Sequence, residues 1–152
     1  MPARTAADAH LDSAAIAAQL RLSVTRLARR LRQESGSGYS PSQLSALAVI
    51  DNHGPLTLGA LADHERVAPP SITKVVAKLE AEGLVQRTTD PSDRRVTHVA
   101  PTAAGRTLIA ETRRRKTTWL TERVRELPED ELARLRAALD VLDHLVAQGE
   151  RP

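Results

Sequence analysis

The chain has 152 residues, a net charge of +3 and no cysteine, and 41% of its residues are hydrophobic. This length and composition are typical of one globular domain, and the missing thiols exclude disulfides, thiolate zinc sites and cysteine nucleophiles. With one Trp, one Tyr and no Phe, the chain lacks the aromatic side chains on which single-stranded nucleic acids usually stack.

Hydropathy and charge are unevenly distributed along the chain. No apolar run approaches the roughly 18 residues of a membrane span, and residues 1–10 lack the apolar stretch of a secretory signal, so we expect a cytoplasmic protein. Residues 126–152 carry seven acidic and three basic residues, a net charge of −4, which leaves +7 on residues 1–125. A polyanion would therefore meet the first 125 residues rather than the end of the chain.

The first predicted helix covers residues 12–35 and follows a loose arm at residues 1–11. Glycines in the segment 36–38 end it, because two glycines among small polar residues interrupt a helix strongly. Apolar residues recur within it every three or four positions, which is the period of a helix. They are Ile16, Leu20, Val24, Leu27 and Leu31.

Three shorter helices are predicted to follow. Ser40 and Gln43 have the spacing of a capping box, with a proline between them at the first helical position. Thr57 caps the next helix, and Pro69-Pro70 opens the one after it. In this last helix the inward side is apolar, whereas the outward side carries hydroxyls and amines.

A β-hairpin is predicted next, because the period of the sequence changes. Residues 84–89 and 96–99 are short β-rich runs, and the charged segment 90–95 between them, Asp-Pro-Ser-Asp-Arg-Arg, is typical of a turn. We expect the second strand to end by Ala100, since Pro101 cannot donate a hydrogen bond to a strand ladder.

Two helices are predicted over residues 102–148. Thr102 caps the first of them, which extends to about Glu126, and the second begins with acidic residues in its first turn, where the helix dipole favours them. Apolar residues in the second helix recur at alternating spacings of three and four, which is typical of a heptad seam. They are Leu132, Leu135, Leu139, Leu142 and Val146.

The order of these elements indicates a mainly α-helical fold with a small β-hairpin wing. Residues 40–100 would form a winged helix-turn-helix domain, flanked by dimerisation helices at 12–35 and 102–148. The major groove of DNA admits one helix that offers small or hydrogen-bonding side chains to base edges, and a narrow minor groove attracts an inserted arginine. The predicted DNA-binding residues are Pro70, Ser71, Thr73, Lys74, Lys78, Arg87, Arg94 and Arg95.

The apolar stripes near both ends of the chain predict a homodimer. A small winged domain cannot cover both stripes, and a two-fold dimer would bury them and place two recognition helices about one DNA turn apart, as a pseudo-palindromic operator requires. The predicted interface residues are Ile16, Leu20, Leu132, Leu135, Leu139, Leu142 and Val146.

Four motifs in this order resemble the MarR (multiple antibiotic resistance regulator) family of transcription factors. They are Thr-Leu-Gly-Ala-Leu-Ala at 57–62, the segment 71–85 that ends in Leu-Glu-Ala-Glu-Gly-Leu-Val, Asp-Pro-Ser-Asp-Arg-Arg at 90–95, and Pro-Thr-Ala-Ala-Gly at 101–105. The resemblance covers residues 12–147, and its one visible departure is Pro101, where the family usually has leucine.

The resemblance implies a homodimer that binds palindromic double-stranded operators, mostly as a repressor. It also implies release of DNA when a small aromatic or phenolic anion binds between the dimerisation helices and the winged domain, and Arg21, Tyr39 and Trp119 are the candidate ligand-binding residues. By the same analogy Arg95 enters the minor groove, and the Asp93 carboxylate orients it.

Alternative interpretations exist for each of these features. The winged helix could be a protein-interaction module without specific DNA binding, the lysines could form a solvated helix face, and the two aromatic residues could be packed in the core. The basic run at 113–116 could contact DNA or form ion pairs. No clustered catalytic set indicates an enzyme, and the five histidines have no metal-ligand spacing, so we expect neither a metal nor a cofactor.

Overall fold

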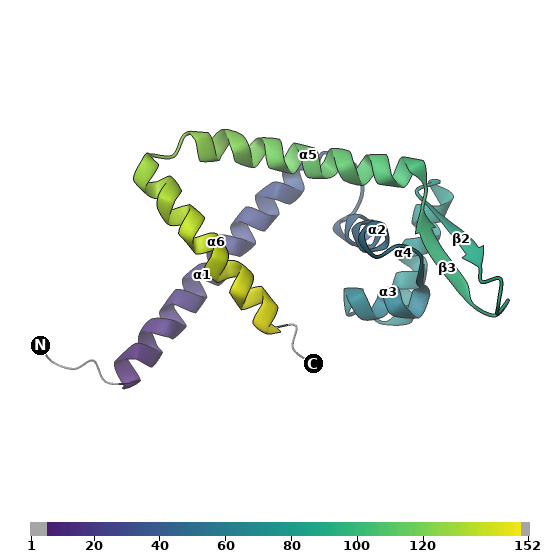
Figure 1. Ribbon diagram of the computed structural model, residues 1–152, viewed down its shortest axis with the longest axis horizontal. Coiled ribbons are helices and arrows are strands. Elements are labelled where there is room, and N and C mark those ends of the chain that lie inside the picture. The colour runs from purple at the N-terminus through teal and green to yellow at the C-terminus, as the bar shows by residue number, and fades with distance from the viewer. Residues whose placement is uncertain (1–5, 150–152) are drawn as a thin grey trace, which may run out of the picture. The chain divides into compact units, whose positions relative to one another are not determined.

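The computed structural model describes residues 6–149, which form six helices and three strands. The chain divides into two units, and the boundary between Lys116 and Thr117 falls inside α5. None of the helices in this range is long and apolar enough to cross a membrane. In chain order the elements are α1 (Ala6–Glu34), α2 (Pro41–His53), β1 (Leu56–Thr57), α3 (Leu58–Glu65), α4 (Pro69–Ala81), β2 (Val85–Thr89), β3 (Thr97–Pro101), α5 (Ala103–Arg125) and α6 (Glu129–Gly149) (Figure 1).

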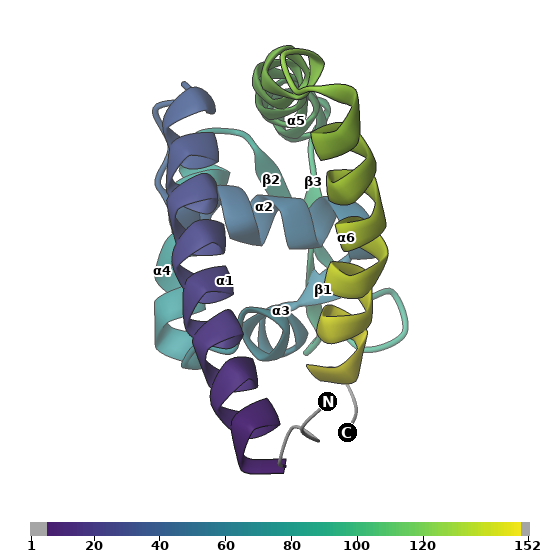
Figure 2. The same ribbon diagram turned by 90° about the vertical axis from the view of Figure 1, so that its left-hand side faces the viewer.

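Helix α1 begins at Ala6, whereas the periodicity of the sequence placed its start at Asp12. The segment from Ala6 to Leu11 has no repeating apolar position, but it is rich in alanine, the strongest helix former, and contains no glycine or proline. Helical propensity alone therefore extends the element. Helices α1 and α6 are each continuous along their length (Figure 2). The first five residues of the predicted arm lie outside the described residues.

The predicted helix caps are confirmed. Ser40 Oγ accepts a hydrogen bond from the Gln43 N–H at 3.2 Å, and Gln43 Oε1 accepts one from the Ser40 N–H at 3.0 Å, which completes the capping box of α2. Thr57 Oγ1 accepts a hydrogen bond from the Ala60 N–H at 3.1 Å and caps α3. Each bond satisfies an N–H group that would otherwise have no intrahelical partner.

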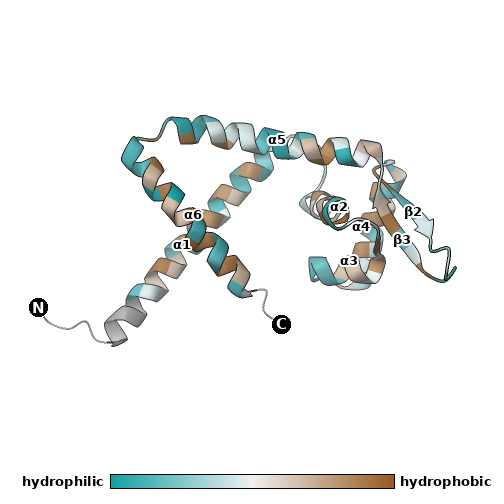
Figure 3. Ribbon diagram, in the orientation of Figure 1, coloured by the Kyte–Doolittle hydropathy of each residue, from teal (hydrophilic) through white to brown (hydrophobic). Residues whose placement is uncertain are grey.

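The hydrophobic core lies in the winged domain, where α2, α3 and α4 pack against the sheet and the beginning of α5 (Figure 3). The side chains at its centre are fully buried and come from four different elements. They are Leu47 and Ile50 of α2, Leu61 of α3, Val76 and Leu79 of α4, and Val99 of β3. Burying each of these side chains stabilises the fold by about 1.5–3 kcal/mol relative to leaving it exposed.

The sheet has three antiparallel strands in the order β1-β3-β2. The strand β1 has only two residues, Leu56 and Thr57, which pair with Val99 and His98, and the sequence contained no signal for it. The expectation that β3 ends by Ala100 is wrong, because Pro101 pairs with Val85. The missing donor is tolerated at this last position, since the ladder continues with the Thr102 N–H, which donates to Leu84 O at 3.0 Å.

The start of α5 is attached closely to the turn between α4 and β2. Thr102 Oγ1 donates a hydrogen bond to Gly83 O at 2.6 Å and accepts one from the Gly105 N–H at 3.1 Å. Gly105 is buried against the Leu84 carbonyl, and a Cβ at this position would overlap Leu84 O and lie 3.1 Å from Leu84 C. This contact fixes α5 to the base of the hairpin.

Candidate nucleic-acid interface

Helix α4 presents a largely polar outer face because its large apolar side chains turn inward. Ile72, Val76 and Leu79 are buried in the core at helical spacing, which leaves the opposite side of the helix in solvent. The exposed side carries all the residues that the sequence predicted for this helix. They are Pro70, Ser71, Thr73, Lys74 and Lys78.

The polar side chains on this face differ in whether they already have a hydrogen-bond partner within the chain. The Thr73 hydroxyl donates to Pro69 O at 2.9 Å, so its oxygen can still accept a hydrogen bond and its methyl group can make apolar contacts. The side chains of Lys74 and Lys78 make no hydrogen bond or ion pair within residues 6–149. The face therefore combines hydrogen-bonding hydroxyls with free positive charge, which suits both base edges and phosphates.

The hairpin turn is held together by one carboxylate. Asp90 Oδ1 accepts hydrogen bonds from Ser92 Oγ at 2.5 Å, from the Ser92 N–H at 2.7 Å and from the Asp93 N–H at 3.3 Å. The hydroxyl bond from Ser92 and then the two N–H bonds hold the pKa of Asp90 below its usual value. The ionised carboxylate therefore fixes the turn above that pKa, and the stabilisation is lost as the pH falls through it.

This role of Asp90 and Ser92 was not predicted, although the sequence contained a signal for it. An aspartate two residues before a serine, with proline between them, is typical of a turn in which the side chain accepts backbone hydrogen bonds. His98 Nδ1 of β3 lies 4.0 Å from Asp90 Oδ2 and adds attraction when it is protonated.

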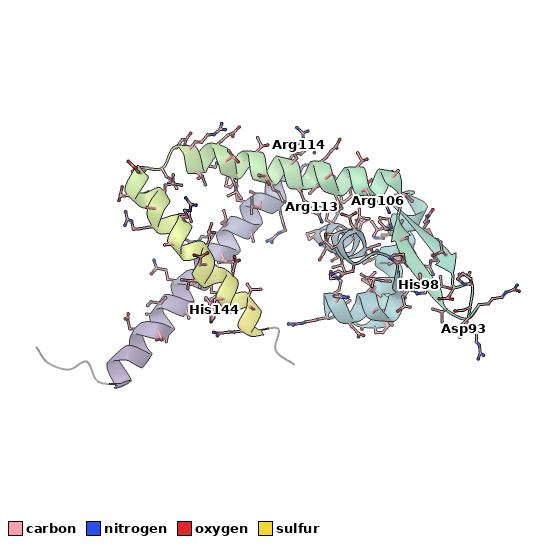
Figure 4. The ribbon with its side chains drawn as sticks, in the orientation of Figure 1. Asp93, His98, Arg106, Arg113, Arg114 and His144 are labelled. Atoms are coloured by element: carbon pink, nitrogen blue, oxygen red, sulfur yellow. The ribbon has the colours of Figure 1, made fainter. Side chains whose placement is uncertain are left out.

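Asp93 lies at the hairpin tip (Figure 4), and the two residues after it, Arg94 and Arg95, are exposed. Asp93 Oδ1 accepts a hydrogen bond from the Arg95 N–H at 3.0 Å and lies 3.6 Å from Arg95 Nε. The Arg95 side chain is 94% exposed, and Arg94 is exposed and has no ion pair within the part of the chain that the structure describes. The tip therefore projects two charges into solvent from an ordered turn.

Arg87 differs from the other predicted contacts because it already has a partner. Its Nε donates to Glu80 Oε2 at 2.9 Å, so the pair links β2 to the last turns of α4. The sequence separation of seven residues did not indicate this bond. Arg87 connects the hairpin to α4, and part of its guanidinium is used for that connection.

The basic run on α5 is partly used inside the chain. Arg113 donates to Asp51 Oδ2 at 3.2 Å and to Asn52 Oδ1 at 2.8 Å at the end of α2, while Arg114 points to the opposite side of α5 (Figure 4). Arg115 Nη1 donates to the carbonyl oxygens of Ser35 and Gly36 at 3.1 and 3.2 Å. Two of the four cations therefore fasten α5 to neighbouring segments of its own chain.

A cleft of about 410 Å³ lies in the first unit. Its apolar wall and three cations come from the end of α1, from α2 and from α5. The lining residues are Arg32, Pro41, Leu44, Ser45, Ala48, Ile109, Thr112, Arg113 and Lys116. The three cations were not predicted for a ligand site, because Arg32 lies 81 positions before Arg113 and 84 before Lys116, and only the fold brings Arg32 near α5.

The three residues predicted for ligand binding do not line this cleft. Tyr39 packs against the core of the winged domain, and Arg21 is exposed on α1. Trp119 belongs to the second unit, where the Arg123 guanidinium lies 4.2 Å from the centre of its ring.

The predicted interface residues lie on helices whose apolar side chains are largely uncovered. On α1, Ile16 is 59% exposed and Leu20 is half-buried. On α6, Leu139 and Val146 are 51% and 64% exposed, Leu132 and Leu135 are also exposed, and Leu142 is half-buried. Exposed apolar rows of this kind are typical of interaction surfaces.

Comparison with known proteins identifies the family. The MarR family model matches residues 39–97. An uncharacterized HTH-type transcriptional regulator of Mycobacterium leprae is 44% identical over 141 residues, which cover 91% of this chain and 99% of that protein. The crystal structure of a Pseudomonas aeruginosa protein matches with a TM-score of 0.79 at 34% identity and covers 89% of this chain and 96% of that one.

A third match is the Staphylococcus aureus protein MepR, in a mutant form bound to an oligodeoxyribonucleotide. It has a TM-score of 0.68 at 20% identity and covers 86% of this chain and 97% of that one, so it shows the same fold. The family match, the identity over nearly the whole chain and the six-helix fold with its β wing show that this chain belongs to the MarR family of DNA-binding winged helix-turn-helix transcriptional regulators, which are not enzymes.

Proposed function

We propose that this regulator is a homodimeric repressor that binds a pseudo-palindromic operator. Helix α4 would enter the major groove, and the hairpin tip would enter the adjacent minor groove. The observation that carries the proposal is the free positive charge on both elements. The side chains of Lys74 and Lys78 on α4 and of Arg94 on the tip have no partners within residues 6–149, and the Arg95 side chain is 94% exposed.

The chemistry of the two elements matches the two grooves. The hydroxyls of Ser71 and Thr73 suit base edges, and the lysines suit the phosphates that border the major groove. At the tip, Asp93 Oδ1 accepts a hydrogen bond from the Arg95 N–H and lies 3.6 Å from its Nε, and this pair would orient the extended guanidinium for entry into a minor groove. The negative potential of a narrow minor groove then favours its insertion.

Dimerisation would follow from the uncovered apolar rows of α1 and α6. A two-fold dimer buries the same rows on both subunits, and it repeats α4 once per half-site. Half-sites one helical turn apart, about 34–36 Å, fit two such helices on one face of the duplex. A dimer on an operator that overlaps a promoter would repress transcription by excluding the polymerase.

Arg95→Ala is expected to weaken operator binding about 5- to 150-fold, because it removes one charged minor-groove contact worth roughly 1–3 kcal/mol. The measurement is fluorescence anisotropy of the purified protein on duplex DNA from immediately upstream of its own gene, with a scrambled duplex as competitor and a salt titration. The plot of log affinity against log salt should also lose about one unit of slope.

Arg125→Ala provides the matched control, because it removes the same charge from an exposed position at the end of α5. An Arg95→Ala protein with unchanged affinity would remove the wing from the proposal. Binding by the wild-type protein that is weak, insensitive to salt and equal on the scrambled duplex would instead favour the alternative function, a protein-interaction module.

The cleft in the first unit supports regulation by a small aromatic carboxylate. Arg32, Arg113 and Lys116 supply positive charge, and Leu44, Ala48 and Ile109 supply an apolar wall for a ring. A ligand releases DNA only if it binds one arrangement of the winged domains better than the other. The site we propose therefore consists of these residues rather than Arg21, Tyr39 and Trp119.

Benzoate or 2-hydroxybenzoate is expected to displace the labelled duplex, whereas the uncharged benzyl alcohol should not. Lys116→Ala should raise the concentration of acid that displaces half of the duplex by about tenfold, since a charge-assisted contact contributes roughly 1.5–3 kcal/mol. The same variant should bind DNA as tightly as the wild-type protein when no ligand is present. Equal displacement by the acid and the alcohol, or an undiminished response of Lys116→Ala, would contradict a carboxylate site at this cleft.

A further inference from the structure

The turn between α3 and α4 contains a strained arginine. Arg66 has φ 52° and ψ 44°, and it is the only residue other than glycine with a positive φ among residues 6–149. L-amino acids with a Cβ are disfavoured in this left-handed region, which glycine adopts freely. The conformation is required here, because a left-handed residue at this position lets the Val67 N–H donate to Ala62 O at 3.1 Å and so end α3.

Nothing inside the chain explains why this position is an arginine. The Arg66 side chain is exposed, and it makes no hydrogen bond or ion pair within the described residues. Arg87, Arg113 and Arg115, by contrast, each hold a neighbouring segment in place. The acidic neighbour Glu65 accepts a hydrogen bond from Ser45 Oγ at 2.8 Å instead. Strained backbone positions are concentrated at functional sites in proteins, so the exposed charge of Arg66 indicates a binding role.

Arg66 lies shortly before the N-terminus of α4, the predicted recognition helix. Pro69 begins α4 three residues later, and Pro70 and Ser71 follow on the exposed face. In helix-turn-helix proteins the recognition helix contacts bases with its N-terminal residues. The turn that enters this helix therefore runs beside the sugar-phosphate backbone at the edge of the groove, where a free guanidinium finds phosphate oxygens.

We propose that Arg66 binds a phosphate of the DNA backbone and thereby positions the N-terminus of α4 in the major groove. In this view the left-handed backbone is kept because it directs an arginine at the turn, where glycine would be more stable. The proposal rests on DNA binding by the family, and it is independent of the dimer and of the carboxylate ligand proposed above.

Arg66→Gly separates the two effects of this residue. It should raise the melting temperature, since glycine relieves the backbone strain, and at the same time lower duplex affinity about three- to tenfold. The slope of log affinity against log salt should fall by about 0.9, the value for one phosphate contact. Affinity should fall equally on the upstream duplex and on the scrambled duplex, because a phosphate carries no sequence information.

Three further variants make the result decisive. Arg66→Asn removes the charge but keeps a side chain that tolerates the left-handed region, so it replaces Arg66→Gly if added flexibility lowers the melting temperature. Arg66→Lys restores a charge and should recover most of the salt slope, and Arg125→Ala should change neither slope nor affinity. Unchanged affinity and salt slope in both Arg66→Gly and Arg66→Asn would overturn the proposal. A loss of affinity confined to the upstream duplex would also overturn it, because that result would indicate a contact with a base.

Discussion

Gly105→Ala is expected to destabilise the winged domain by about 3 kcal/mol, at the upper end of the range for overpacking a core. The added Cβ would overlap Leu84 O and approach Leu84 C within 3.1 Å, and both atoms belong to the backbone, which cannot rotate away as a side chain can. The same turn accepts hydrogen bonds from Thr102, so moving it also strains the start of α5. Urea unfolding followed by circular dichroism measures the loss.

Gly59→Ala is the matched control for this experiment. Gly59 also lies within a helix, but the nearest atom to a Cβ there is Thr57 Oγ1 at 3.9 Å, an ordinary contact distance. Alanine at an unstrained helical position should stabilise the protein by about 0.4–1 kcal/mol. If Gly105→Ala unfolded at the same urea concentration as the wild-type protein, the close packing of α5 on the hairpin base would be refuted.

Leu139→Asp is expected to convert the proposed dimer into monomers. Leu139 lies in the middle of the α6 heptad seam and is 51% exposed in the single chain. Two-fold symmetry would place one carboxylate per subunit in an apolar interface, and burying each unpaired charge carries a penalty of several kcal/mol. Sedimentation velocity should show a monomer at concentrations where the wild-type protein is a dimer, and operator affinity should fall with it.

Val141→Asp tests whether the seam itself matters. Val141 is 60% exposed on the same helix, but it is two residues from Leu139 and therefore about 200° around the helix axis. It should leave the dimer intact, and both variants should keep the unfolding transition of the winged domain. A Leu139→Asp protein that sediments as a dimer would exclude this seam from the interface.

Local signals accounted for the elements and their caps. The capping box at Ser40, the cap at Thr57 and the prolines that open α4 act over three or four residues, so neighbouring positions are enough to detect them. The outward residues of α4 were predictable for the same reason, since the buried positions of a helix define its exposed side. Helix α1 started earlier than expected because alanine-rich sequence needs no apolar stripe to be helical.

Contacts between distant segments were not visible in the sequence. The strand β1 has two residues and exists only because β3 offers an edge. The sequence did not show that Arg87 forms an ion pair with Glu80. It also presented the arginines of α5 as one basic run, whereas in the structure Arg113 binds Asp51 and Arg115 binds the carbonyl oxygens of Ser35 and Gly36. Ion pairs and hydrogen bonds of this kind depend on approach in space rather than on separation along the chain.

The amino-acid sequence alone predicts the order of the elements, the polar face of α4 and the basic hairpin tip, because helical period, turn residues and charge are properties of neighbouring positions. The folded structure, in contrast, is needed to see which arginine side chains have partners elsewhere in the described residues, and which of two helical glycines can accept a side chain. It also brought Arg32, Arg113 and Lys116 to one cleft. These outcomes depend on which backbone atoms and side chains approach one another after the chain has folded, and the packing of the core sets that approach.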